Sequence, residues 1–101
     1  MGRRDEAGPN PVRFRGRYVS KSFFYVYILQ SETVPARHYT GFTEDLQARL
    51  ARHNAGACEH TAAWRPWRLR TAVAFSDRQR ALTFERYLKS HSGRAFTSKH
   101  F

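Results

Sequence analysis

The sequence predicts an α+β fold: a small three-stranded, mainly antiparallel sheet flanked by helices in the order ββαβα, with a possible extra helix. An aromatic and β-branched run at residues 23–30 and an alternating run at 68–75 are typical of strands. Two amphipathic stretches, each preceded by a capping residue, are typical of helices. A chain of 101 residues that is 41% hydrophobic forms one domain with a modest core.

Residues 1–20 are rich in Arg, Gly and Pro and show no hydrophobic periodicity. We expect them to form a mobile basic arm that adds non-specific phosphate contacts. The folded domain is expected to span residues 21–101.

The first expected strand, residues 23–30, is apolar on both faces, so it should lie centrally in the sheet and be covered on both sides. A polar loop with Pro35 leads to a second strand at residues 37–40, which can pair with the first as a hairpin. Gly41 is expected to end that second strand.

The first helix should begin after Thr43 as N-cap, with the acidic residues 44–45 in its first turn, where the helix dipole favours them. It should run to about Asn54, because the sequence Asn-Ala-Gly follows. Leu46 and Leu50 provide its buried stripe.

The third strand is expected at residues 68–75, after a loop that holds two tryptophans. Asp77 can cap a second long helix that ends near Ser90. Gly93 is expected to stop it, and residues 94–101 form a short final helix or turn.

The charge balance points to a polyanionic partner. The chain has 18 Lys and Arg against 8 Asp and Glu, a formal net charge of +10, which is typical of proteins that bind nucleic acid. The lone Cys58 excludes an internal disulfide and suits the cytoplasm. The longest apolar run, residues 23–29, is too short to span a bilayer, so no membrane partner is expected.

An acidic residue falls on the apolar side of the second helix. Glu85 is spaced three or four residues from Ala81, Leu82 and Leu88, which mark the packing face. A carboxylate there needs a cation or hydrogen-bond donors. Two interpretations stay open: an ion pair with one of the many arginines, or a ligand for a divalent metal such as Mg²⁺, which uses few protein carboxylates.

Cations and phenols complete the candidate set. Arg49 and His53 are four residues apart, hence on one helix face, and together can clamp a phosphate. Tyr27 and Tyr39 fall on adjacent expected strands, where tyrosines mostly serve packing. A phenol can also act as a general base when a nearby cation lowers its pKa.

In this order and on these elements, the residues resemble the GIY-YIG nuclease family. The first signature appears at residues 25–27 as Tyr-Val-Tyr, and the second at 39–41 as Tyr-Thr-Gly. The family arginine corresponds to Arg49, the histidine or tyrosine one turn later to His53, and the family glutamate to Glu85. The resemblance runs from about Phe23 to the end and is greatest to small stand-alone members.

The sequence departs from the family pattern at several positions. Tyr25 and Val26 replace glycine and isoleucine in the first signature, and Thr40 replaces isoleucine in the second. No asparagine follows the glutamate helix, and Phe42 stands where some members have a lysine.

The resemblance implies hydrolysis of DNA phosphodiester bonds during the repair or processing of branched or damaged DNA. A tyrosine would activate water for in-line attack, with Tyr39 favoured over Tyr27 because it is nearer in sequence to the Arg49 helix. Arg49 would neutralise the phosphoryl group, and His53 would orient the base or the phosphate. One Mg²⁺ or Mn²⁺ ion held by Glu85 would stabilise the leaving oxygen.

Two other functions stay open: a nucleic-acid-binding module of the same fold that cuts poorly, and a basic ribosome-associated or interaction protein. Binding alone needs no acid on an apolar face, which favours the nuclease. Further phosphate contacts are expected from Arg52, Arg65, Arg68 and Arg94. The oligomeric state is left open.

Overall fold

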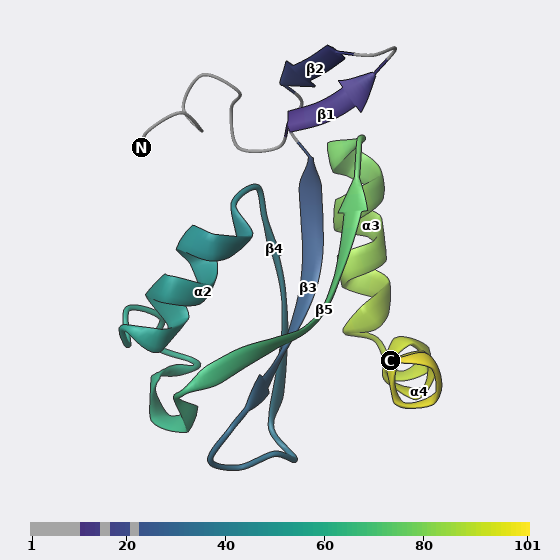
Figure 1. Ribbon diagram of the computed structural model, residues 1–101. Helices are drawn as coiled ribbons and strands as arrows, with labels where there is room; N and C mark the ends of the chain where they lie inside the picture. The colour runs from purple at the N-terminus through teal and green to yellow at the C-terminus, as the bar shows by residue number, and fades with distance from the viewer. Residues whose placement is uncertain (1–10, 15–16, 21–22) are drawn as a thin grey trace.

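A computed structural model describes residues 11–14, 17–20 and 23–101. The elements are β1 (Pro11–Phe14), β2 (Arg17–Ser20), β3 (Phe24–Ser31), β4 (His38–Thr43), α2 (Leu46–Asn54), a short 3₁₀ helix (Ala62–Trp64), β5 (Trp67–Phe75), α3 (Arg78–Leu88) and α4 (His91–His100). Strands β3, β4 and β5 form an antiparallel sheet in the order β4-β3-β5 (Figure 1). The domain from β3 onward therefore has the order ββαβαα, and the predicted α+β fold is confirmed.

The two N-terminal strands form a hairpin of their own. β1 and β2 pair with each other antiparallel, in a sheet separate from the three-stranded one. The predicted basic arm over residues 1–20 lies partly outside the described residues and stays a prediction.

The central strand β3 is covered on both faces, as its apolar sequence predicts. Val26 and Ile28 pack on one face with residues of α3, and Tyr27 and Leu29 pack on the other with Trp67. All four β3 side chains are 1% exposed. Full burial of such a side chain contributes about 1.5–3 kcal/mol, so these alternating residues fix which face of β3 meets which helix.

Helices α2 and α3 lie on opposite sides of this sheet (Figure 1). On the α2 side, Leu46 and Leu50 pack against Tyr27 and Leu29, which confirms the predicted stripe. Within the described ranges, no helix has the length and apolarity needed to cross a membrane.

The hairpin and the start of α2 differ from expectation. β4 does not end at Gly41 but continues to Thr43, because Gly41 and Phe42 still pair with β3. The helix therefore starts later, and its N-cap is Asp45, whose carboxylate accepts the Ala48 N–H at 3.1 Å. The prediction of Thr43 as cap was wrong.

The C-terminal helix is longer than expected. Asp77 caps α3 as predicted, but α3 ends at Leu88 and α4 already begins at His91. Gly93 lies inside α4 and does not stop a helix. A Cβ at this position would meet the Tyr87 carbonyl oxygen and Leu88 Cα, so Gly93 allows α4 to pack tightly against the end of α3.

Candidate active site

Three aromatic rings from three elements meet on the α2 side of the sheet. The ring centroids of Tyr27 on β3 and Tyr39 on β4 are 6.3 Å apart. The His53 ring on α2 lies 5.9 Å from Tyr27 and 5.0 Å from Tyr39. The structure thus brings both candidate phenols and the candidate histidine into one cluster.

A chain of hydrogen bonds fixes the proton positions in this cluster. Thr61 Oγ1 donates to the Cys58 carbonyl at 3.3 Å, so its single hydrogen is used and it must accept from His53 Nδ1 at 2.8 Å. The other ring nitrogen, Nε2, is then an acceptor in the neutral imidazole, and the Tyr27 hydroxyl donates to it at 3.0 Å. All the donors therefore point the same way, from Tyr27 through His53 to Thr61.

Burial has the largest effect on the pKa values of Tyr27 and His53. Burial raises the pKa of Tyr27 to about 12, although the Arg49 guanidinium acts to lower it. Burial also lowers the pKa of His53, and the positive charges of Arg49 and Arg52 lower it further. Both effects favour the uncharged phenol and imidazole that the hydrogen bonds require. They also run against the expectation that a cation makes Tyr27 more acidic than a free phenol.

The neutral, buried His53 predicts a stability that depends on pH. Because the pKa of His53 is lowered from 6.5, the unfolded chain binds more protons than the folded chain between the lowered pKa and 6.5. The free energy of unfolding should therefore be fully retained above pH 6.5 and fall as the pH drops through that window. Urea unfolding at a series of pH values measures this slope. The slope should shrink in His53→Gln, and identical slopes in both proteins would contradict the prediction.

Gly41 makes room for the Tyr27 phenol. The two residues are cross-strand partners in the β3–β4 pair. A Cβ at Gly41 would collide with the Tyr27 hydroxyl oxygen and the carbon that bears it. The absence of a side chain here lets the phenol lie against the β4 backbone and reach His53.

Gly41→Ala should therefore lower stability by about 1–3 kcal/mol, the usual cost of overpacking a buried position. It should also displace the Tyr27 hydroxyl from His53. Urea unfolding measures the first effect, and NMR of the His53 ring measures the second. Ala72→Ser is the matched control, because Ala72 is the exposed partner of Tyr27 on β5. A Gly41→Ala protein as stable as this control would refute the role given to Gly41.

Arg49 lies on α2 beside the edge of the sheet. Its Nη1 donates to the Phe42 carbonyl of β4 at 3.3 Å, and its charge acts on both Tyr27 and His53. Arg49 and His53 lie on one helix face, as predicted, and the positive charge of Arg49 acts to lower the pKa of His53. Four of the five candidates meet here, from β3, β4 and α2.

Glu85 approaches the cluster from the other side of the sheet. It lies on α3, its side chain is 17% exposed, and its Oε2 is 2.8 Å from Lys89 Nζ. Lys89 Nζ in turn lies 5.7 Å from the centroid of the Tyr39 ring. The cation that pairs with Glu85 is thus a lysine one turn away, where the sequence pointed to an arginine. Glu85 is linked to the four other candidates through Lys89 and Tyr39, around the β4 edge.

A metal ion at this site would depend on Glu85. Among residues 11–14, 17–20 and 23–101, no three His, Cys, Asp or Glu side chains come together as a metal site. The Oε2 atom of Glu85 pairs with Lys89, so a metal ion would have to displace this ammonium group or bind the other carboxylate oxygen. A single carboxylate suits Mg²⁺ or Mn²⁺, whose other positions are filled by water and phosphate oxygens.

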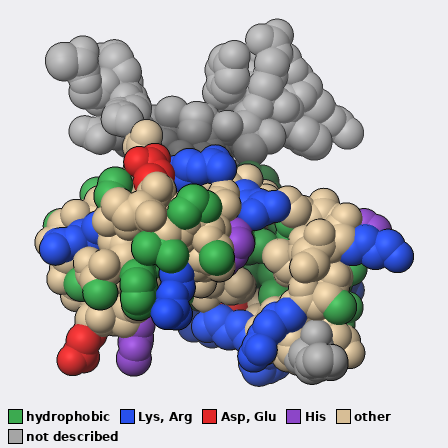
Figure 2. Space-filling view, turned by 90° about the horizontal axis from the view of Figure 1, so that it is seen from below, with side chains coloured by type: hydrophobic (Ala, Val, Ile, Leu, Met, Phe, Trp, Pro, Cys, Tyr) green, Lys and Arg blue, Asp and Glu red, His purple; other side chains and the backbone are tan. Residues whose placement is uncertain are grey.

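The arginines expected to contact phosphates are all exposed. Arg68 donates to the Gln30 side chain at 2.7 Å, and Arg94 donates to the Lys89 carbonyl at 3.4 Å. Lys and Arg side chains gather around a hollow on the face shown in Figure 2. The Arg37 guanidinium lies over the Trp64 ring, 4.0 Å from its centroid.

Sequence reasoning missed two residues of the site. Lys89 is four residues after Glu85, so the helical i, i+4 rule was the signal that could have found it. Thr61 lies in the loop between α2 and β5, and no local pattern in the sequence connects it to His53.

The family model for the GIY-YIG catalytic domain matches residues 23–99. The chain belongs to this family. The two GIY-YIG signatures are the two paired strands β3 and β4, and the tyrosine that ends the first signature, Tyr27, faces the glycine that ends the second, Gly41. The collision that a Cβ at Gly41 would cause gives the signature glycine a physical reason.

Named relatives fall into two groups. The chain is 43% identical over 75 residues to the structure-specific endonuclease subunit SLX1 of Scheffersomyces stipitis, covering 67% of this chain and 22% of that protein. It is 38% identical over 85 residues to a UPF0213 protein of Lactiplantibacillus plantarum, covering 81% and 79%. A UPF0213 protein of Halobacterium salinarum is 35% identical over 69 residues, covering 67% and 87%. The GIY-YIG domain is thus about a fifth of the SLX1 subunit and most of each UPF0213 protein. No solved structure matches the chain significantly.

Proposed function

We propose that this GIY-YIG protein is a divalent-metal-dependent endonuclease that hydrolyses DNA phosphodiester bonds. One observation carries the proposal: the contacts that join two phenols, a guanidinium, an imidazole and a carboxylate around the edge of β4. Packing alone does not require this combination of groups, whereas phosphoryl transfer needs a base, charge neutralisation and a metal ligand, all held on rigid elements.

In the proposed mechanism, Tyr39 is the general base. Its side chain is half-buried, whereas that of Tyr27 is 1% exposed and commits its proton to His53. Tyr39 would take the proton from the attacking water, and the Lys89 ammonium group lies 5.7 Å from the centroid of its ring. Tyr27 and the neutral His53 position the Tyr39 ring through their contacts with it.

Arg49 is proposed to bind the phosphoryl oxygens as negative charge builds up on them. Its bond to the Phe42 carbonyl uses one N–H of Nη1 and supports its orientation. A divalent cation held by Glu85 would stabilise the charge on the leaving oxygen. Until such an ion binds, Lys89 pairs with the Glu85 carboxylate at 2.8 Å.

The proposed substrate is DNA that is branched or damaged, in repair or processing. The net charge of +10 and the exposed arginines Arg52, Arg65, Arg68 and Arg94 support binding to phosphates. The relative from Scheffersomyces stipitis is named a structure-specific endonuclease subunit, which supports a substrate other than plain duplex. A cytoplasmic location, expected from the lone Cys58, stays a prediction.

A DNA-binding module that cuts poorly is the second candidate. The ion pair between Glu85 and Lys89 favours it, because a metal must compete with an ammonium group for the same carboxylate.

A cleavage assay decides between the two. Supercoiled plasmid and branched DNA are incubated with Mg²⁺, Mn²⁺ or EDTA, using the wild type and Arg49→Ala. Arg86→Ala is the control, because it removes the same charge from the exposed side of α3. We expect metal-dependent cutting by the wild type and by Arg86→Ala, with the rate lowered by about 10²–10³-fold in Arg49→Ala. This result would support the nuclease. Binding without cutting under all conditions supports the module.

A further inference from the structure

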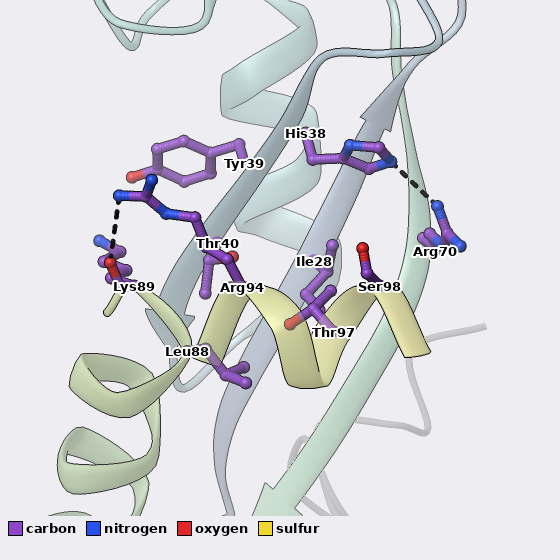
Figure 3. A pocket seen from close by; sticks show the side chains of 10 residues that line it. All are labelled: Ile28, His38, Tyr39, Thr40, Arg70, Leu88, Lys89, Arg94, Thr97 and Ser98. Carbon is purple, nitrogen blue, oxygen red and sulfur yellow. Dashed lines mark hydrogen bonds between the residues drawn. The ribbon is translucent and has the colours of Figure 1, made fainter. Parts of the chain in front are cut away.

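A cavity of about 640 Å³ lies beside the site, between the α3 side of the sheet and α4. The apolar side chains of Ile28 and Leu88 line it, together with the hydroxyl groups of Thr40, Thr97 and Ser98 (Figure 3). Its volume is within the range of about 300–1,000 Å³ that small-molecule sites occupy. An apolar wall with a few hydroxyls suits a flat ring that carries polar edges.

Positive groups stand on two sides of this cavity. Figure 3 shows Lys89 and Arg94 at one end, and His38 and Arg70 at the other. Among the residues that the structure describes, those that line the cavity include no Asp or Glu. The cavity therefore suits a ligand that has negative charge on both sides of a ring.

Hydrogen bonds fix the position of the Arg70 guanidinium and leave two of its N–H groups available. Its Nε and Nη2 donate to the Phe101 carbonyl at 3.1 and 2.7 Å, and its Nη1 donates to His38 Nε2 at 2.9 Å. These bonds use three of the five guanidinium hydrogens, so one hydrogen on each terminal nitrogen remains for an anion. The same bond makes His38 Nε2 an acceptor, so His38 Nδ1 carries a hydrogen and is a further donor.

The cavity and the candidate active site share two residues. Tyr39 and Lys89 line the cavity, while Tyr39 also contacts His53 and Lys89 also pairs with Glu85. A strand with one phosphate at the active site therefore has its next nucleotide close to the cavity.

We propose that the cavity takes one unpaired nucleotide of the DNA strand that is bound at the active site, with its base beside Thr40, Thr97 and Ser98. The flanking phosphates would lie toward Lys89 and Arg94 at one end, and toward Arg70 and the Nδ1–H of the neutral His38 at the other. A base in a duplex is stacked and paired and must flip out to enter the cavity, at a cost of about a few kcal/mol, whereas an unpaired base enters at lower cost. The inference rests on the proposed function and adds what the enzyme recognises: an unpaired position next to the cleaved bond.

The test is a binding experiment without catalysis. Fluorescence anisotropy in EDTA compares a DNA that carries a short single-stranded flap with a paired duplex that has the same number of phosphates. We expect the wild type to bind the flap DNA about tenfold more tightly, the effect of one well-placed base. Equal phosphate number keeps the general electrostatic attraction the same in both arms.

Ser98→Phe should remove the preference by filling the cavity. Phe and Ser have similar helix propensities and position 98 is exposed, so folding should be little affected. Ser92→Phe is the control, on the same helix at an exposed position outside the lining set. It should keep the preference.

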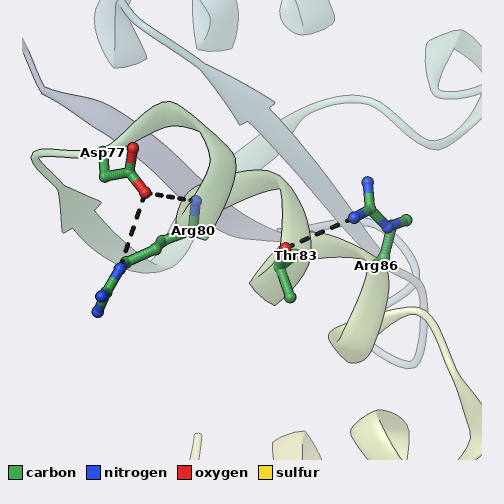
Figure 4. A network of polar contacts seen from close by, with 4 residues as sticks. All are labelled: Asp77, Arg80, Thr83 and Arg86. Atoms are coloured by element: carbon green, nitrogen blue, oxygen red, sulfur yellow. Dashed lines mark hydrogen bonds and ion pairs between the residues drawn. The ribbon is translucent and has the colours of Figure 1, made fainter.

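Arg94→Gln should lower the preference by several-fold, since a well-placed charged group is worth about that in binding. Arg86→Gln is its control, because Arg86 lies on the exposed side of α3, outside the cavity. It donates there to Thr83, near the Asp77–Arg80 ion pair (Figure 4). This control should weaken flap and duplex binding equally. Equal affinity of the wild type for both DNAs, or a preference unchanged by Ser98→Phe and Arg94→Gln, would overturn the proposal.

A free mononucleotide has the same chemistry as the strand nucleotide. Competition with thymidine monophosphate separates the two sources: failure to displace the flap DNA supports recognition within a strand, and efficient displacement overturns it. The outcomes also stay separate from those of the cleavage assay. A flap preference without cutting leaves this inference standing and removes the nuclease, and cutting without a flap preference does the opposite.

Discussion

Glu85→Gln is expected to lower the rate of DNA cleavage by about 10³-fold, equivalent to about 4 kcal/mol in the activation barrier. Glutamine keeps the size of the side chain and removes its charge, so the site loses the one acid that the proposal assigns to the metal. Lys89 loses its partner at the same time and adds positive charge beside Tyr39. DNA affinity should therefore be unchanged or slightly higher while cutting is lost.

Two measurements separate this effect from misfolding. Plasmid cleavage at saturating DNA gives the rate, and anisotropy in EDTA gives the affinity. Glu59→Gln is the matched control, because Glu59 is an exposed carboxylate in the loop after α2. A Glu85→Gln protein that cuts within threefold of the Glu59→Gln rate, on the order of the scatter among surface variants, would rule out the metal-ligand role.

Tyr39→Phe should have the second-largest effect, a loss of about 10²–10⁴-fold in cleavage with little change in stability. The half-buried Tyr39 phenol reaches the cavity, and no hydrogen-bond chain within the described residues commits its proton as it does for Tyr27. Removal of its hydroxyl should therefore remove the base and leave the packing intact.

Tyr27→Phe is the informative comparison. It leaves His53 Nε2 buried without its donor, which typically costs about 1–3 kcal/mol. This variant should be the less stable of the two in urea and the more active per folded molecule. The reverse order, with Tyr27→Phe folded normally but inactive, would move the role of base to Tyr27.

The sequence predicted an element correctly where its residue pattern is compatible with only one structure. From Phe24 to Leu29, β3 has aromatic or aliphatic side chains on both faces. The sequence therefore predicted correctly that it is central in the sheet and covered on both faces. Asp77 precedes an amphipathic stretch and caps α3 as predicted. The phase of α3 also placed Glu85 correctly at the border of the packed face, where 17% exposure of its side chain agrees with a partly buried acid.

The misses come from contacts that no local pattern encodes. Gly41 was interpreted as a break, yet pairing with β3 carried the strand on to Thr43 and moved the cap to Asp45. The sequence placed His53 on the same helix face as Arg49 but did not indicate that its side chain is 1% exposed. Its burial depends on Thr61, which comes from a loop whose path only the folded chain defines.

In the described part of the chain, β4 is an outer strand of the three-stranded sheet, and this position limits how the protein can associate with others. Arg49 bonds to the outer strand β4 from one side, and Lys89 approaches Tyr39 of the same strand from the other. A strand that extended the sheet along β4, whether from a second copy or from another protein, would lie across the proposed active site and keep nucleic acid away from it. Any assembly that remains active must therefore join through a different surface, and one that joins here would be an inhibited form.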